Sequence, residues 1–279
     1  MAEMRLTANQ PIGLAHFSAI HLPPLDLVEH AARAGFAAVG LRLVPAFPGA
    51  PAYEIPAGSS ASSILRRSLS DTGISVYDIE FATVGPDFDV NLLDPVLEDA
   101  AELGARRLSL CGDDPDLERL ADHLSALAER ARPYGMGLDL EIMPWRVVKN
   151  LPTALGVLQA ADAPELGILI DALHLSRSGG DPADLSAVPP SLLQSVQLCD
   201  AQPVAPTHTE ALIAEARSGR LAPGTGVLPL RTLLAAMPDS CVISVEVPSL
   251  DVDPSEHIGS LMSATHAMVA LICAEEPER

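Results

Sequence analysis

The sequence has few aromatic residues and no long apolar run. Aromatic side chains make up only 3% of its 279 residues, so we expect the aliphatic residues Leu, Ala, Val and Ile to fill the core. No apolar run reaches the roughly 18 residues that a membrane-spanning helix needs. The first residues lack a basic region followed by an apolar stretch. We therefore expect no membrane segment and no cleaved leader.

Basic residues are also scarce. The chain has 37 acidic and 17 basic residues, which gives a formal net charge of −20. Because nucleic acids and anionic membranes are bound through Lys and Arg, we expect neither as a partner. The four cysteines are widely spaced, without a Cys-x-x-Cys pair, and three lie in apolar, strand-like runs. Buried free thiols and a cytoplasmic location fit this pattern best.

Several catalytic motifs are missing. The chain has no Gly-x-Ser-x-Gly elbow, no Gly-x-x-x-x-Gly-Lys-Ser/Thr phosphate loop and no His-Glu-x-x-His pair. These absences argue against an α/β-hydrolase, a P-loop nucleotidase and a zinc protease of the common type. No Gly-x-Gly-x-x-Gly follows the first apolar run, which weakens a dinucleotide-binding fold.

Short apolar runs alternate with longer amphipathic stretches along the whole chain. Runs of 4–8 apolar residues are typical of parallel strands that are covered on both faces. The predicted strands are Ile12–His16, Ala37–Leu43, Ile74–Phe81, Arg107–Cys111, Gly137–Ile142, Leu166–Asp171, Leu193–Cys199 and Val242–Val247. The predicted helices include Leu25–Ala34, Ser59–Thr72, Asp94–Leu103, Asp116–Arg132, Leu151–Ala161 and Pro254–Ile272. Glycines follow several of the helical patterns closely, as C-terminal caps do. These glycines are Gly35, Gly73, Gly104 and Gly135.

Strands that alternate with helices predict a parallel sheet built from βα units. An open doubly wound sheet is the structural alternative. Eight units in 279 residues favour a closed, eight-stranded (β/α)8 TIM barrel, and we expect residues 1–279 to form this single domain.

Four consecutive predicted strands end in a side chain with an oxygen ligand. These residues are Glu141, Asp171, Gln197 and Glu246. One such residue is explained equally well by a strand end in contact with solvent. Barrel closure brings all four together, however, and three carboxylates at short range repel one another unless a cation neutralises them. Since active sites of these barrels lie at the carboxyl ends of the strands, we predict a divalent-metal site there.

The same residues resemble the metal site of the xylose isomerase-like barrels, the sugar phosphate isomerase/epimerase superfamily. That family has Glu, Asp, His and Glu ligands on successive strands and an Asp-x-x-His motif. Glu141, Asp171 with His174, and Glu246 match this pattern, and the resemblance covers nearly the whole chain. It implies that His174 binds a substrate oxygen rather than the metal. Subunits of the family often form dimers or tetramers, so a homodimer or homotetramer is possible here.

Gln197 stands where the family usually has a His ligand. A Gln carbonyl would complete a ligand set made entirely of oxygen, which favours Mn²⁺ or Mg²⁺ over Zn²⁺. The alternative is that Gln197 has lost ligation and that three carboxylates and water hold the metal.

Other polar residues at the same ends are substrate-binding candidates. Arg177 has a forked guanidinium for an anionic or carbonyl group, or it pairs with Asp181 or Asp184. Glu80 and Arg42 end the third and second strands and contact substrate, or pair with each other.

Further candidates follow the later strands. We expect Asp200 to contact substrate or to support a ligand. Trp145 forms an apolar wall or packs under a loop. His16 is a weaker candidate at the first strand. The stretch 201–220 is long for a βα connection, so we expect a partial lid or a subunit contact. In the family, a Pro-Gly-x-Gly stretch like the one in Arg220–Gly226 closes over the substrate.

This site predicts chemistry next to a carbonyl group. A metal bound to a carbonyl and the adjacent hydroxyl acidifies the C–H between them and stabilises an enediolate. Glu141 and Glu246 would act as the base and acid. We expect an isomerase or epimerase acting on a small polyhydroxy carbonyl compound such as a sugar. A metal-dependent dehydratase or lyase on a keto-sugar or keto-cyclitol is the alternative. A non-catalytic binding barrel is a lesser alternative, and a metal-dependent nuclease of the same superfamily is disfavoured by the charge.

Overall fold

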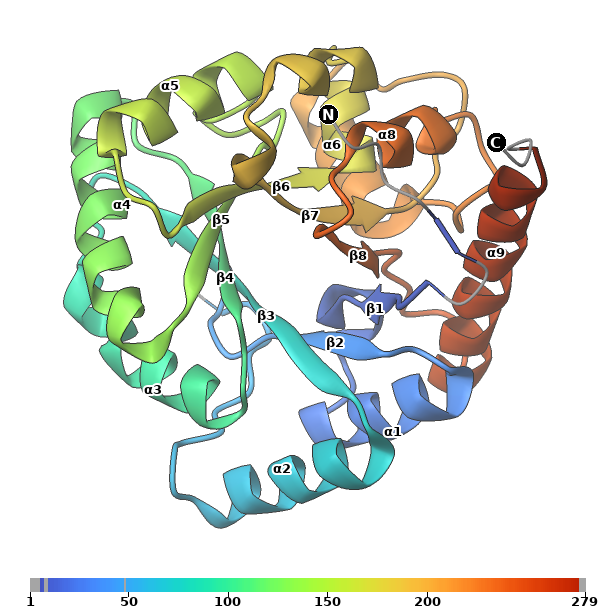
Figure 1. Cartoon of the computed structure of the whole chain (residues 1–279), viewed down its shortest axis with the longest axis horizontal. Helices are drawn as coiled ribbons and strands as arrows, with labels where there is room; N and C mark the ends of the chain where they lie inside the picture. The colour runs from blue at the N-terminus through green and yellow to red at the C-terminus, as the bar shows by residue number, and fades with distance from the viewer. Residues whose placement is uncertain (1–5, 8–9, 48, 276–279) are drawn as a thin grey trace.

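Eight parallel strands close into a barrel in the computed structural model, which describes residues 6–7, 10–47 and 49–275 (Figure 1). Each strand pairs with the next in sequence, and the last pairs with the first. The strands are β1 Gly13–Leu14, β2 Ala38–Leu41, β3 Ser75–Val84, β4 Arg107–Gly112, β5 Gly137–Glu141, β6 Leu166–Asp171, β7 Leu193–Leu198 and β8 Val242–Val245. The predicted TIM barrel is therefore confirmed, and the open sheet is excluded. That one domain covers 1–279 stays a prediction, since 1–5, 8–9, 48 and 276–279 lie outside the described residues.

Helices surround the barrel on the outside (Figure 1). They are α1 Pro24–Ala34, α2 Ser60–Thr72, α3 Asp94–Glu102, α4 Leu117–Ala131, α5 Leu151–Ala161, α6 Ala172–Arg177, α7 Thr209–Ala214, α8 Leu230–Ala236 and α9 Pro254–Glu275. The six helices predicted from the sequence agree with α1–α5 and α9 to within a few residues. The short α6, α7 and α8 were not predicted. A π-helical turn, Glu215–Gly219, follows α7 directly.

Side-chain caps and glycines set the helix ends, as the sequence suggests. The Ser59 side chain accepts a hydrogen bond from the Ser62 amide at the start of α2, and Asn150 accepts one from the Thr153 amide at the start of α5. The four glycines predicted as caps all have left-handed backbones, with φ between 66° and 92°. This conformation is one that glycine adopts without strain, and it turns the chain into the next strand.

The barrel interior nearer the amino ends of the strands is polar, contrary to the expectation that branched aliphatics fill it. Asp139 on β5 accepts a hydrogen bond from Ser195 on β7 (2.9 Å), a contact that crosses the interior because β6 lies between the two strands. Arg107 on β4 pairs with Asp139 at 2.6 Å. Gly167 leaves room for this pair, since a Cβ there would lie 2.8 Å from Asp139 Oδ1.

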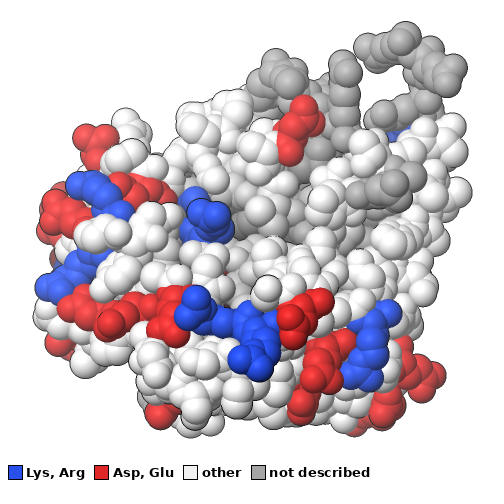
Figure 2. Space-filling model, turned by 60° about the horizontal axis from the view of Figure 1, so that its bottom comes forward, with Lys and Arg blue, Asp and Glu red and all other residues white. Residues whose placement is uncertain are grey.

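The helix α9 is long and apolar enough, by length and composition alone, to cross a membrane. It packs against α1 as part of the helical ring (Figure 1), and helices in the ring of a barrel commonly have such a composition. On the face shown in Figure 2, acidic and basic side chains are intermixed along the lower edge and do not form a basic stripe.

Candidate active site

The structure brings together the four strand-end residues predicted as metal ligands. Asp171 on β6 and Gln197 on β7 are direct register partners on neighbouring strands. Glu141 ends β5, and Glu246 follows β8, where its backbone amide donates to Leu198 O at 3.0 Å and continues the sheet. All four side chains are buried. Parallel strands therefore deliver these oxygen ligands to one end of the barrel, as expected.

Arg220 lies in the middle of these carboxylates, and the sequence analysis did not identify it as a site residue. Its Nη1 is 2.5 Å from Asp171 Oδ2, and its Nη2 is 2.9 Å from Glu246 Oε2. The same Nη2 is 3.4 Å from His174 Nε2. The Arg220 side chain is only 2% exposed, so these ion pairs are fully shielded from water. A fixed cation thus supplies part of the neutralisation that the sequence analysis assigned to a metal alone.

Burial and mutual repulsion give these acidic groups different pKa values. Burial, with repulsion from Glu80 and Asp171, raises the pKa of Glu246 to about 7 despite the attraction of Arg220. Burial also raises the pKa of Glu141 well above its usual range, and the charges of Glu246 and Asp171 add to this. Burial acts in the same sense on Asp171, but Arg220 and His174 together lower its pKa below the usual value. Asp171 is therefore the group held as a permanent anion.

His174 is neutral at pH 7, because burial lowers its pKa to about 4. Its backbone amide donates to Asp171 Oδ1 at 2.8 Å, which makes Asp171 the N-cap of α6. This cap places the ring beside the carboxylates, with Nε2 3.6 Å from Glu141 Oε1. Trp145 packs edge-on against the ring, with centroids 5.0 Å apart.

The donor set fits a divalent cation. One ligand atom each from Glu141, Asp171 and His174 lies within 4.8 Å of the others. The Oε1 atom of Gln197 is buried and has no hydrogen-bond partner among the described residues, while its Nε2 is 3.4 Å from Glu246 Oε1. An orphaned carbonyl oxygen beside several carboxylates is the arrangement that a hard cation would satisfy. His174, which the family resemblance assigns to substrate, is part of the triad as well.

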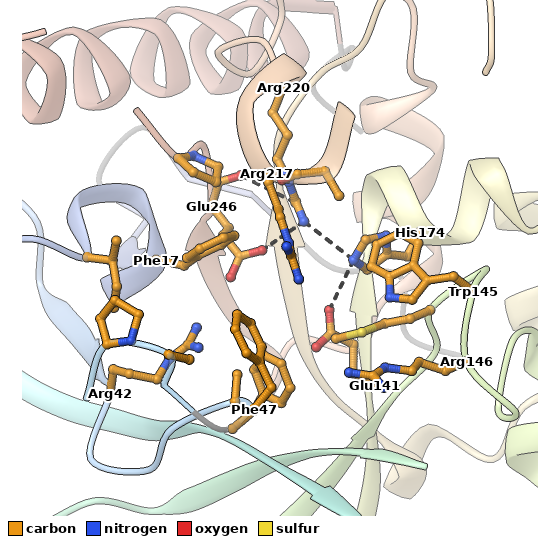
Figure 3. A pocket seen from close by; sticks show the side chains of 18 of the residues that line it. Phe17, Arg42, Phe47, Glu141, Trp145, Arg146, His174, Arg217, Arg220 and Glu246 are labelled. Atoms are coloured by element: carbon orange, nitrogen blue, oxygen red, sulfur yellow. Dashed lines mark hydrogen bonds and ion pairs between the residues drawn. The ribbon is translucent and has the colours of Figure 1, made fainter. Parts of the chain in front are cut away.

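A pocket of about 240 Å³ opens onto these groups (Figure 3). Glu141, His174, Arg220 and Glu246 line its polar end. The rest of the lining is largely apolar and includes four of the nine aromatic residues of the chain: Phe17, Phe47, Phe81 and Trp145. Trp145 therefore forms the apolar wall that was one of its two expected roles. Concentration of so scarce a residue type in one pocket favours a ligand with a flat, carbon-rich face.

Arg42 and Glu80 are each other's ion-pair partners, at 3.2 Å, which was one of the two predicted roles. Glu80 also accepts hydrogen bonds from the amides of His16 (2.6 Å) and Phe17 (3.1 Å). Arg42 nonetheless lines the pocket, with its guanidinium 4.9 Å from the Phe81 ring centroid. His16 is a structural residue, because its Nδ1 accepts from the Arg42 amide and its Nε2 bonds to Leu22 O.

The structure places Arg177 away from the pocket lining. Its guanidinium binds both carboxylate oxygens of Glu215, at 2.7 and 2.8 Å. The predicted alternative, a pair with Asp181 or Asp184, is wrong, because those two residues cap their own short helix reciprocally. Arg177 therefore anchors the segment between β7 and β8 and leaves no fork free for a substrate.

Asp200 also supports this segment and does not line the pocket. Its Oδ1 accepts hydrogen bonds from the amides of Ala201 (2.9 Å) and Leu228 (2.8 Å). The supporting role was one of its two predicted roles. The partial lid or subunit contact expected for 201–220 stays a prediction, and Ala216, Arg217 and Arg220 of this segment line the pocket. Among the described residues the cysteines are all free, as expected from their spacing.

Comparisons with known proteins agree with the observed fold. The family model described as "xylose isomerase-like TIM barrel" matches residues 28–264. A 3-dehydroshikimate dehydratase of Pseudomonas aeruginosa is 31% identical over 142 residues, which are 48% of this chain and 22% of that protein. One of Pseudomonas putida is 28% identical over 140 residues, 48% of this chain and 21% of the relative. The match thus spans about a fifth of the length of these curated relatives.

Solved structures share the fold. The IolI protein with a bound zinc atom superimposes with a TM-score of 0.76 at 16% identity, over 94% of this chain and 99% of that one. An L-ribulose 3-epimerase has a TM-score of 0.68 at 17% identity, over 94% of each chain.

Proposed function

The chain belongs to the xylose isomerase-like TIM barrel family, and on this premise we propose that it is a divalent-metal-dependent dehydratase of a cyclic hydroxy ketone. The supporting observation is a pair of buried carboxyls, Glu141 and Glu246, with raised pKa values beside an aromatic-lined pocket. They come from the ends of non-adjacent strands, so they flank a ligand rather than share one side of it. The pKa of Glu246, about 7, suits a proton-transfer group near neutral pH, and the raised pKa of Glu141 favours its protonated, acid form.

Asp171 and Gln197 would hold the metal throughout, and Glu141 and Glu246 would each ligate it in their anionic form. A bound divalent cation supplies positive charge beside a substrate carbonyl, which acidifies the neighbouring C–H. The oxygen-rich donor set favours Mn²⁺ or Mg²⁺ over Zn²⁺. His174 is the nitrogen donor nearest to the carboxylates, and it favours Zn²⁺ if it ligates.

The chain's own residues account for the proton transfers. Glu246 takes the proton from the carbon next to the carbonyl, and the C–H electron pair becomes a C=C bond as the β C–O bond breaks. Protonated Glu141 gives its proton to the departing hydroxyl, which leaves as water. Glu246 then loses a proton to solvent and Glu141 regains one. Neutral His174 lies beside Glu141, with Nε2 3.6 Å from Oε1, and the cation of Arg220 stabilises negative charge as the C–H bond breaks.

Isomerisation or epimerisation, which the sequence analysis placed first, uses the same abstraction and is the second candidate. The flanking positions of Glu141 and Glu246 suit proton return to another face or carbon. Two observations favour dehydration. The pocket lining includes four aromatic side chains, which suit the flat face of a ring. The curated relatives act on 3-dehydroshikimate, a cyclic hydroxy ketone whose dehydration yields an aromatic ring.

Incubation in deuterated water distinguishes dehydration from isomerisation or epimerisation. Protein loaded with Mn²⁺ is incubated in deuterated water with 3-dehydroshikimate and, separately, with L-ribulose and other ketoses. We expect an ultraviolet-absorbing aromatic product from the cyclic ketone, and little deuterium in the ketoses. Deuterium incorporation into a ketose without loss of water would contradict the dehydratase proposal and support an isomerase or epimerase.

The variants Glu246→Gln and Glu141→Gln test the assigned acid and base. Each should lower kcat by about 10²- to 10⁴-fold, the usual contribution of a proton-transfer group. The matched control is Glu29→Gln, a half-exposed glutamate on α1 that pairs only with Arg33 among the described residues. Glu246→Gln with wild-type turnover would refute its role as the base.

A further inference from the structure

Arginines gather at the pocket of this strongly acidic chain. Two glutamates and four arginines line it, and the arginines are Arg42, Arg146, Arg217 and Arg220. Three of the four are already neutralised: Arg42 by Glu80, Arg146 by Asp113 at 2.5 Å, and Arg220 by Asp171 and Glu246.

Arg217 is the exception. Among the described residues it makes no hydrogen bond or ion pair. Its guanidinium lies over the ring of Phe47, 5.2 Å from the ring centroid. Figure 3 shows it pointing into the centre of the pocket, between the wall of Phe17 and Arg42 and the wall of Trp145 and His174. All its forked donors are therefore available to a ligand.

The backbone that carries Arg217 is fixed on both sides. Glu215, two residues earlier, is tied to Arg177 by two hydrogen bonds. Arg220, three residues later, is buried among the carboxylates of the site. Between them the chain forms a π-helical turn, a rare conformation that recurs at functional sites. The fold therefore fixes the backbone of Arg217 at the pocket, while its side chain is exposed to solvent.

We propose that Arg217 binds a carboxylate on the substrate ring and thereby selects anionic over neutral substrates, an inference that rests on the proposed dehydratase function. The ring lies against Phe47, with its ketone toward Glu141 and Glu246. Its carboxylate accepts two parallel hydrogen bonds from the guanidinium. A neutral polyol or sugar leaves this cation unpaired.

A chemical comparison tests the assignment during turnover. The two substrates are 3-dehydroshikimate and its methyl ester, which removes the charge but keeps the ring. For the wild type we expect kcat/KM to be about tenfold higher for the acid, the lower end for a hydrogen bond to a charged group, because Arg217 is exposed to solvent. Arg217→Gln should lose this preference through a higher KM, with kcat unchanged. Arg217→Lys should keep part of it.

Arg33→Gln, an exposed arginine of α1 that pairs only with Glu29 among the described residues, is the matched control and should behave as the wild type. An acid-to-ester preference in Arg217→Gln equal to that of the wild type would overturn the proposal.

A binding experiment tests the anion site at Arg217 independently of the dehydratase reaction. Benzoate and benzamide are titrated against quenching of Trp145, the only tryptophan, which lines the pocket. If neither substrate turns over but benzoate binds about tenfold better than benzamide in an Arg217-dependent manner, the dehydratase proposal fails and the anion site stands. Equal affinities in the wild type would refute the anion site whatever the reaction.

Discussion

Replacement of Arg220 by methionine is expected to make folding depend on a metal. Methionine retains much of the apolar stem and removes the guanidinium from Asp171 and Glu246, the partners at 2.5 and 2.9 Å. The lost cation would leave like charges facing one another in a buried site. Arg220→Lys, which keeps a positive charge, is the matched control.

The size of the effect follows from burial. Removal of one partner from a buried ion pair costs about 3–5 kcal/mol. Since the pKa of Glu246 is about 7, this group is partly neutral at pH 7 and Asp171 bears most of the loss, so we expect about 3 kcal/mol. A divalent ion at a hundred times its Kd returns about 2.7 kcal/mol. Metal should thus restore nearly all of the stability of the variant.

Urea unfolding provides the measurement, followed by far-ultraviolet circular dichroism and by Trp145 fluorescence, with coincident transitions as the criterion for two states. Each protein is unfolded in EDTA and in Mn²⁺. The Mn²⁺-induced gain should be larger for Arg220→Met than for the wild type, because no fixed cation competes for the carboxylates. The loss in EDTA should shrink at pH 5, where Glu246, with a pKa of about 7, is protonated and no longer repels Asp171. A variant as stable as the wild type in EDTA would show that Arg220 does not neutralise these groups.

Three further predictions concern other parts of the chain. Gln197→His should shift the metal preference toward Zn²⁺ by adding a nitrogen ligand, measured by calorimetric titration with Zn²⁺ and Mn²⁺; an unchanged ratio would indicate that position 197 does not ligate. Burial raises the pKa of Asp78 well above its usual range, so its favourable neutral form is present at low pH and lost as pH rises; Asp78→Asn should therefore increase urea stability, by more at pH 9 than at pH 5. Gly226→Ala places a Cβ 2.3 Å from Ala201 O and should cost about 2 kcal/mol and lower activity, whereas Gly156→Ala in α5, with open space, should gain about 0.5–1 kcal/mol.

The strand ends were predictable because their positions depend on a regular pattern. The βα alternation identifies a parallel barrel, and in a parallel barrel all carboxyl ends meet at one face, so Glu141, Asp171, Gln197 and Glu246 converge whatever the loops do. The polar barrel interior around Asp139 was also predictable from the sequence. Asp139 is two residues before Glu141 on one strand, and the period of two puts both on the inner face.

Arg220 was not predictable in the same way, because it lies in an irregular segment whose path no periodicity determines. The one available signal was the excess of acidic strand ends, which requires a cation of some kind. A metal was inferred from that excess, and the structure shows that an arginine supplies part of the neutralising charge. The unpredicted α6, α7 and α8 are only six or seven residues long, too short to show a helical period clearly.

The cap that joins Asp171 to His174 has an evolutionary consequence. One hydrogen bond, from the His174 amide to Asp171 Oδ1, ties the first residue of the pair to the third position of α6. An inserted or deleted residue between them would release the carboxylate from its fixed orientation and rotate the imidazole by about 100° around the helix axis. The two positions must therefore be inherited as a unit of fixed spacing, while the residue at 197, on a separate strand and free of any such cap, can change without altering the spacing of a helix. A family that keeps one barrel and changes its metal would be expected to vary there first.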